Sequence, residues 1–148
     1  MKDAQQAIED AERRELLRRM LGFAHHHHTR LAERTAELGL TPAQAKALYF
    51  VATSPTTGRL AKRLHCDASN LTGIVDRLEA LGFIERYTDS VDRRVKRLAI
   101  TETGRHVRLQ VERAMFDVPE LDVLSAEQQT QLSGLMELVW QEGDPLAD

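Results

Sequence analysis

The chain has 148 residues, of which 42% are hydrophobic and 29% charged, and these values predict a single soluble globular domain. No apolar run reaches the length of a membrane span, and the N-terminus lacks the apolar region of a signal peptide, so we expect a cytoplasmic protein with no membrane partner. The single cysteine excludes an intrachain disulfide and a cysteine zinc cluster.

Charge is distributed unevenly along the chain. The net charge is −3, but residues 59–97 hold nine basic and six acidic side chains, so this central segment is basic and the two flanks together are acidic. A basic segment between acidic ends favours a partner with negative charge, such as nucleic acid.

The first half of the chain predicts three helices. Apolar positions recur every three or four residues from residue 4 to residue 38, which is the pattern of one long amphipathic helix. Thr41 and Gln44 form a capping box, and the proline that follows Thr41 suits the first helical position, so a second helix is expected over 42–53. A short third helix is expected over 58–64.

The fourth helix is the best-defined element of the sequence. Asp67 is a suitable N-cap, and Gly82 stands where a C-cap glycine belongs. Between them, apolar residues recur at helical spacing and form one stripe: Leu71, Ile74, Val75, Leu78 and Leu81.

Two short β-prone runs follow, at 83–87 and 95–100, and the polar loop between them is too short for anything but a hairpin. Two helices that are joined by a tight turn and followed by a hairpin form a winged helix-turn-helix. We therefore expect a mainly α fold with a small β-hairpin wing.

Two further helices complete the chain. Thr101 caps a fifth helix that Pro119 ends, and Ser125 opens the last helix, which runs to about residue 140. The first helix and the last two have apolar faces that no sheet covers, so we expect a homodimer to bury them. One compact domain would then contain an N-terminal dimerisation helix, a winged helix-turn-helix lobe and C-terminal dimerisation helices, at 1–40, 41–101 and 102–148.

The fourth helix is the element expected to enter DNA. Its buried stripe turns the residues between to the opposite side, where short polar side chains permit close entry into a groove. Ser69, Asn70 and Thr72 can hydrogen-bond base edges or phosphates, and Arg77 lies on the same side. A glycine within a helix costs about 1 kcal/mol relative to alanine, so Gly73 indicates either close backbone approach to DNA or tight helix packing.

Basic residues also mark the hairpin. Arg93 and Arg94 lie at its tip, where arginine suits insertion into a narrow minor groove, and Lys96 begins the returning strand. Arg86 on the first strand belongs to the same expected DNA face. An isolated run of charge is more often a solvated surface, but its place directly after a helix-turn-helix favours DNA contact.

The order and spacing of several motifs resemble the MarR family of bacterial winged-helix transcriptional regulators. The resemblance extends over essentially the whole chain, although the terminal helices match in pattern only. Its motifs are the segments 40–44 (LTPAQ), 60–64 (LAKRL), 75–86 (VDRLEALGFIER), 89–94 (DSVDRR) and 100–104 (ITETG).

This resemblance implies an obligate homodimer that binds pseudo-palindromic promoter DNA, with the first, fifth and last helices of both subunits interlocked. It also implies a small-molecule effector that weakens DNA binding from a pocket between the dimerisation region and the DNA-binding lobe. We expect no cofactor. In the wing, Asp92 would orient Arg94, and Arg94 or Arg93 would enter the minor groove. Two residues depart from the family pattern, because Gly73 replaces a common basic residue and Ser90 a frequent proline.

The remaining candidate residues and motifs do not indicate catalysis. Cys66, in the turn of the helix-turn-helix, is expected to be a buried structural thiol. Asp89 and Asp92 form a carboxylate pair beside arginines, which indicates ion pairing rather than acid–base chemistry. The sequence has no phosphate-binding loop, nucleophile elbow or zinc-protease signature, so we do not expect an enzyme.

Four consecutive histidines occupy residues 25–28. Successive helical residues turn by about 100°, so only His25 and His28 come near one face of the helix. The apolar stripe of this helix places His28, and partly His27, on the buried side. We expect a neutral imidazole in the dimer interface or effector pocket and no bound metal. A metal site that uses His25, His28 and the distant His106 is the alternative.

Two hypotheses for the whole chain follow. One is a ligand-responsive repressor that binds promoter DNA, with a metal-responsive repressor as its variant, and the other is a winged-helix protein-interaction module that no longer binds DNA. A module of the second kind has no need for basic residues on the expected DNA face, so their presence favours the first hypothesis: Arg77, Arg86, Arg93 and Arg94.

Overall fold

The structure, a computed structural model, describes residues 2–89 and 96–139. Within these residues the chain forms α-helices, one short 3₁₀ helix and a two-stranded antiparallel hairpin, which confirms the expected mainly α fold with a β-hairpin wing. The elements in chain order are α1 (Lys2–Ala36), α2 (Pro42–Phe50), α3 (Thr57–Arg63), α4 (Ala68–Ala80), β1 (Ile84–Thr88), β2 (Lys96–Ile100), α5 (Glu102–Phe116), η1 (Pro119–Leu121) and α6 (Ala126–Val139).

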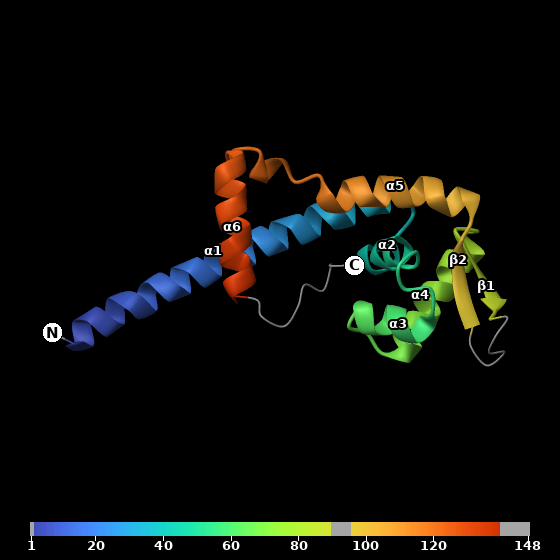
Figure 1. The fold of residues 1–148 in the computed structure, drawn as a ribbon, viewed down its shortest axis with the longest axis horizontal. Helices are drawn as coiled ribbons and strands as arrows, with labels where there is room; N and C mark the ends of the chain where they lie inside the picture. Colours follow the sequence, from blue (N-terminus) through green and yellow to red (C-terminus); the bar gives the residue numbers. More distant parts are fainter. Residues whose placement is uncertain (1, 90–95, 140–148) are drawn as a thin grey trace.

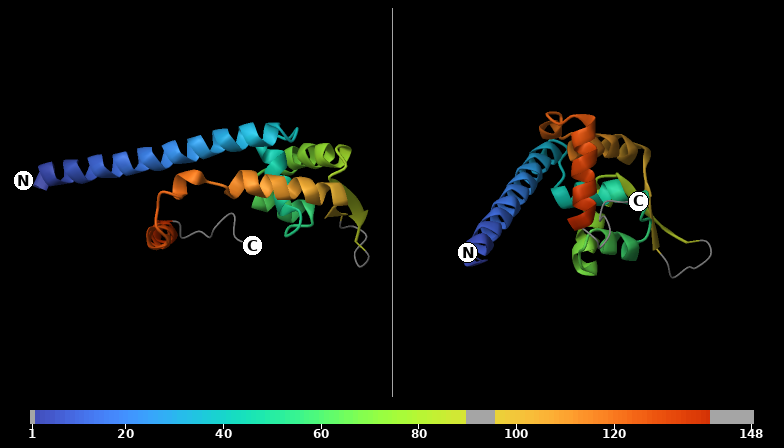
Figure 2. Two further views of the ribbon diagram at one scale, coloured as in Figure 1. Left: turned by 90° about the horizontal axis from the view of Figure 1, so that it is seen from above. Right: turned by 60° about the vertical axis from the view of Figure 1, so that its left-hand side comes forward.

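The described molecule is elongated (Figures 1 and 2). Helices α2, α3 and α4 and the hairpin gather at one end, where α5 runs along the C-terminal part of α1. The N-terminal half of α1 projects away from this lobe, and α6 lies outside it. Two helical segments are thus left without a large packing surface on the described part of the chain.

The helix starts follow the predicted caps. The hydroxyl of Thr41 accepts the backbone N–H of Gln44 at 3.3 Å, and the Gln44 side chain accepts the backbone N–H of Thr41 at 3.0 Å. The same reciprocal pair links Ser125 and Gln128 at the start of α6. Each cap satisfies N–H groups that have no partner inside the helix, which explains why these helices begin at the expected residues.

Helix α2 ends at Phe50, three residues before the expected end at residue 53. The backbone N–H of Thr53 bonds the Phe50 carbonyl oxygen three residues back, at 3.2 Å, so the chain tightens into a turn. Ser54 precedes Pro55, and the proline ring disfavours the helical conformation for the residue before it. The helix therefore stops early.

The turn between α3 and α4 contains a left-handed residue that is not a glycine. His65 adopts φ 49, and the backbone N–H of Cys66 bonds the carbonyl oxygen of Ala61 at 3.1 Å, which closes α3 with a left-handed residue. Cys66 packs against the core and is partly buried, so the expected burial of this thiol is incomplete within the single chain.

One hydrophobic core joins the helices to the hairpin. It takes buried side chains from the C-terminal part of α1, from α2, α4, β2 and α5, among them Leu31, Leu48, Leu78, Leu98 and Val111. Burial of one such side chain contributes about 1.5–3 kcal/mol. The stripe of α4 lies in this core, which fixes the opposite face of α4 toward solvent.

The base of the hairpin is attached to the segment before α3. The backbone N–H of Leu98 bonds the carbonyl oxygen of Pro55 at 2.8 Å, and Thr56 forms a β-bridge with Arg97. Sequence reasoning took residues 54–58 only as a helix breaker and missed this short third strand-like contact.

Over residues 2–89 and 96–139, no helix combines the length and the hydrophobicity that a membrane crossing requires.

Candidate nucleic-acid interface

The solvent face of α4 presents the predicted set of polar residues. The residues between the apolar positions are all exposed: Ser69, Asn70, Thr72, Gly73, Asp76 and Arg77. This follows from the helical period, because the stripe of α4 is buried against α2 and α3.

Two of these side chains form local hydrogen bonds and two do not. The Ser69 hydroxyl donates to the Asp67 carboxylate at 2.7 Å, and the Thr72 hydroxyl donates to the Ala68 carbonyl oxygen at 2.8 Å. The side chains of Asn70 and Arg77 have no partner among the described residues. A side-chain amide can both donate and accept hydrogen bonds, and the amide of Asn70 is exposed on this face.

Asp67 fixes the start of this helix. The backbone N–H of Asn70 donates to the Asp67 carboxylate at 2.8 Å. This hydrogen bond is the largest cause that lowers the pKa of Asp67 below its ordinary value, and the hydrogen bond from the Ser69 hydroxyl is the second. The cap therefore remains ionised at neutral pH and stabilises the helix N-terminus.

Gly73 lies in open space. A Cβ atom at this position would meet nothing within 4 Å. Tight helix packing within the described chain therefore does not explain this glycine.

The described part of the wing holds two polar pairs. Lys96 donates to the Thr88 hydroxyl at 2.8 Å, and Arg97 pairs with the buried carboxylate of Asp89. The predicted wing residues Asp92, Arg93 and Arg94 lie outside the described residues.

The guanidinium of Arg86, unlike that of Arg77, is engaged with partners in the described chain. It bonds Asp76 and Glu79, both on α4, at 2.5 Å each. Sequence reasoning placed Arg86 on the DNA face but missed both partners.

Helix α3 adds two exposed basic residues beside α4. Arg59 and Lys62 both point to solvent, and the charge count of residues 59–97 included them without assigning them a role. Positive side chains at such a position are suited to contact a phosphate group.

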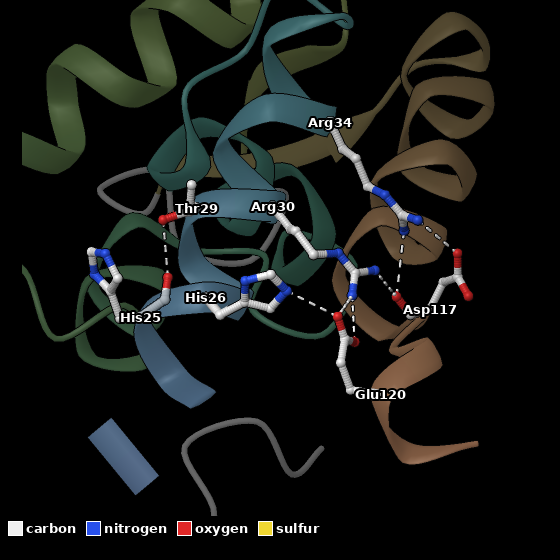
Figure 3. A network of polar contacts seen from close by, with 7 residues as sticks. All are labelled: His25, His26, Thr29, Arg30, Arg34, Asp117 and Glu120. Atoms are coloured by element: carbon white, nitrogen blue, oxygen red, sulfur yellow. Dashed lines mark hydrogen bonds and ion pairs between the residues drawn. The ribbon is translucent and has the colours of Figure 1, made fainter. Parts of the chain in front are cut away.

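A network of polar contacts ties α1 to the chain between α5 and α6 (Figure 3). Arg30 pairs with the Glu120 carboxylate, His26 Nε2 lies 3.0 Å from Glu120 Oε1, and Arg34 Nη2 lies 3.0 Å from Asp117 Oδ2. Hydrogen bonding from Arg30 is the largest cause that lowers the pKa of Glu120 to about 2. Sequence reasoning missed this network, because its partners are far apart in the chain.

The histidines do not lie as the sequence pattern suggests. Within the single chain His28 is exposed and His27 is half-buried, so His27 rather than His28 turns toward the packed side of α1, and the expected place of His28 in a dimer interface or effector pocket stays a prediction. The buried face of α1 is set by Leu31 and Thr35, and stepping back four residues from Leu31 reaches His27. Burial, followed by the charges of Arg30 and Lys46, lowers the pKa of His27.

The described residues hold no group of three or more histidine, cysteine or acidic side chains placed to bind a metal. His25 is exposed on α1, and His106 is exposed on α5, where its Nδ1 lies 2.9 Å from the Glu102 carbonyl oxygen. The three histidines of the alternative metal site are therefore not brought together within one chain.

A cavity of about 330 Å³ lies between the end of α2, strand β2 and α5. Arg108 at its wall donates to the Tyr49 carbonyl oxygen at 3.1 Å, whereas Arg105 is exposed and has no partner in the described chain. The apolar part of the lining comes from Val51, Pro55, Leu98 and Ile100.

Comparison with known proteins places the chain beside one group of regulators. Residues 38–95 match the model of the MarR family. The transcriptional activatory protein BadR of Rhodopseudomonas palustris is 39% identical over 57 residues, which cover 38% of this chain and 33% of BadR. The matched segment is thus about a third of that relative.

Two solved structures are similar over most of their length. YusO of Bacillus subtilis has a TM-score of 0.70 and 22% identity, with 90% of this chain and 98% of YusO covered. A mutant of MarR from E. coli, solved in complex with operator DNA, has a TM-score of 0.69 and 25% identity, with 84% of this chain and 93% of that chain covered.

Proposed function

We propose that this chain, which belongs to the MarR family of transcriptional regulators, binds a pseudo-palindromic promoter site in double-stranded DNA as a homodimer. Family membership makes it a regulator rather than an enzyme, as the sequence predicts. Residues 41–101 would form the DNA-binding lobe, with residues 1–40 and 102–148 as the dimerisation segments.

One observation carries the proposal: α4 buries an apolar stripe and presents an exposed polar face, on which the amide of Asn70 and the guanidinium of Arg77 have no partner among the described residues. In this proposal the face enters the major groove, where Asn70 reads a base edge and Arg77 contacts the backbone. Gly73 lets the helix backbone come close to the DNA. Ser69 and Thr72 can still accept hydrogen bonds through their hydroxyl oxygens.

The wing supplies the second contact in this proposal. Lys96 at the start of β2 lies on the described part of the wing, next to phosphates of the neighbouring groove. Arg93 and Arg94 are assigned from the sequence to the minor groove, with Asp92 orienting Arg94.

The homodimer is supported by apolar side chains that the single chain leaves exposed. Leu16, Leu17 and Leu21 extend the apolar stripe of α1 beyond its packed part, and no residue of α6 is buried. A second copy would cover both helices, and its α4 would reach a half-site about one DNA turn away.

The ligand response would act through the cavity between α2, β2 and α5. Its partly apolar lining and the guanidinium of Arg105, which has no partner in the described chain, suit a small molecule with an acidic group. Such a ligand contacts both α5 and the base of the wing, so it can alter the placement of the DNA-binding lobe relative to the dimerisation helices.

The regulator is proposed to act as a repressor, which the effector releases from DNA. The name of BadR, a transcriptional activatory protein, favours activation as the second candidate. The two are separated by transcription in vitro from a promoter that carries the selected site: a repressor lowers the transcript yield, and an activator raises it.

The test of DNA binding starts with selection from random duplex DNA. We expect enrichment of a two-fold symmetric site, whereas a protein-interaction module would enrich none. On the enriched duplex, Asn70→Ala should cost about 1–3 kcal/mol and relax sequence choice at one position. Arg77→Ala should weaken binding to all sequences and reduce the salt slope by about one, and Arg14→Ala on the exposed side of α1 is the matched arginine control.

A further inference from the structure

We propose that Arg86 is a positioning residue for DNA binding: it holds strand β1 of the wing against α4 and neutralises the Asp76 carboxylate on the face of α4 that meets DNA. The inference rests on the proposed DNA-binding function. It replaces the direct DNA contact that the sequence suggests for Arg86.

The contacts of Arg86 form a bridge between the two DNA-binding elements. Its Nη2 donates to Asp76 Oδ1 at 2.5 Å and its Nη1 to Glu79 Oε2 at 2.5 Å. The other oxygen of Glu79 accepts the backbone N–H of Arg86 at 3.2 Å. The planar fork of a guanidinium suits this arrangement, because it can donate to two carboxylates at fixed angles.

The bridge lies partly out of solvent. The Arg86 side chain is 30% exposed, against 57% for Asp76 and 38% for Glu79. Partial burial opposes the charged guanidinium, but its hydrogen bond to Asp76 and the charges of Asp76 and Glu79 together raise the pKa of Arg86 above its ordinary value. The cation is therefore held between two anions and is not free to reach a phosphate.

The position of Asp76 gives this pairing a functional consequence. Asp76 is three residues after Gly73 and directly before Arg77, so its carboxylate lies on the exposed side of α4. An unpaired carboxylate there would repel DNA phosphates. With Arg86 in place, the group of three side chains carries one negative charge instead of two.

The bridge also restricts the wing. Strand β2 is bonded to Pro55 on one side of the hairpin, and β1 is bonded to α4 through Arg86 on the other. With both strands attached, the hairpin is held at a fixed place relative to α4. Binding two grooves at once requires such a fixed relationship.

Four proteins test the inference on the selected duplex: wild type, Arg86→Gln, Asp76→Asn/Glu79→Gln, and the triple variant. We expect Arg86→Gln to weaken binding about tenfold in the wild-type background and less than about twofold when both carboxylates are already neutral. Arg77→Gln removes an arginine of α4 that has no partner in the described chain, so it should weaken DNA binding by the same factor in both backgrounds.

Two further measurements separate this role from general destabilisation. Arg86→Lys keeps the charge but has no planar fork, so we expect it to recover only part of the lost affinity at an unchanged unfolding midpoint. Hydrogen exchange of the hairpin amides without DNA should quicken in Arg86→Gln and not in Arg77→Gln.

If Arg86→Gln lost the same factor of DNA affinity in both backgrounds, and the salt slope fell by about one, Arg86 would contact a phosphate directly. That result would overturn this inference and leave the proposed function standing. If wild type bound no selected duplex, the proposed function and this inference would both be overturned.

Discussion

A Cβ atom on Gly104 of α5 would lie 1.9 Å from the carbonyl oxygen of Phe83, the residue before β1. The same junction is fixed by Thr101, whose hydroxyl donates to the Gly82 carbonyl oxygen at 2.6 Å and whose backbone N–H bonds the Phe83 oxygen at 3.1 Å. The first turn of α5 thus contacts the backbone that connects α4 to the wing, and only glycine fits there.

Replacing this glycine should destabilise the protein. We expect Gly104→Ala to lower the free energy of unfolding by about 1–3 kcal/mol, because the added methyl group overlaps a backbone oxygen that no side-chain rotation can move. Urea unfolding measures the change. Gly22→Ala is the matched control, since a Cβ there meets nothing within 4 Å and alanine should stabilise α1 by up to about 1 kcal/mol. A stable Gly104→Ala protein would contradict the packing of α5 against Phe83.

Gly73 should separate stability from DNA binding. Gly73→Ala is expected to raise the free energy of unfolding by up to about 1 kcal/mol, because the site is open and alanine favours the helix. The same methyl group should weaken binding to the selected duplex if the α4 backbone approaches it closely. Fluorescence anisotropy and urea unfolding together give the result, again with Gly22→Ala for comparison. Wild-type affinity in Gly73→Ala would show that DNA does not come near this residue.

Charge on the exposed apolar faces should prevent dimer formation. Leu17 on α1 and Leu135 on α6 are both more than half exposed in the single chain. We expect Leu17→Glu and Leu135→Glu to give folded monomers by light scattering at micromolar concentration, because a buried unpaired carboxylate is costly at an apolar interface. Thr130→Glu, an exposed position of α6 with no apolar side chain, is the control and should stay dimeric. A monomeric wild type would refute the homodimer.

The pairing of Glu120 with Arg30 should contribute to the fall of the unfolding free energy at acid pH. The pKa of Glu120 is lowered from 4.5 to about 2, first by the hydrogen bond from Arg30. The folded state therefore binds this proton less readily than the unfolded state, so the stabilisation is complete above pH 4.5 and is lost as pH falls toward 2. Glu120→Gln should flatten the fall of the unfolding free energy over this window.

Arg30→Gln gives the second arm of this experiment. It removes the main cause of the lowered pKa, so it should flatten the same window, and the double variant should add little to either single change. Two independent, additive effects would mean that the two side chains do not interact in solution.

Local signals determined where the helices begin. Thr41, Asp67, Thr101 and Ser125 each cap a helix through a backbone N–H that lies three residues ahead, so the sequence contains both partners side by side. The stripe of α4 is equally local, because helical spacing alone decides which residues share a face. The expected recognition face could therefore be derived from the sequence without knowledge of the rest of the fold.

Only the tertiary structure decided which charged residues are available and which are paired. Arg86 and Asp76 are ten residues apart, and Arg30 and Glu120 are ninety apart, so no spacing rule connects them. The phase of α1 is likewise decided by what packs on it: His27 rather than His28 turns inward because the core closes over Leu31 and Thr35. Sequence periodicity fixes which residues of a helix share a face, whereas the elements packed against that helix decide which face is buried.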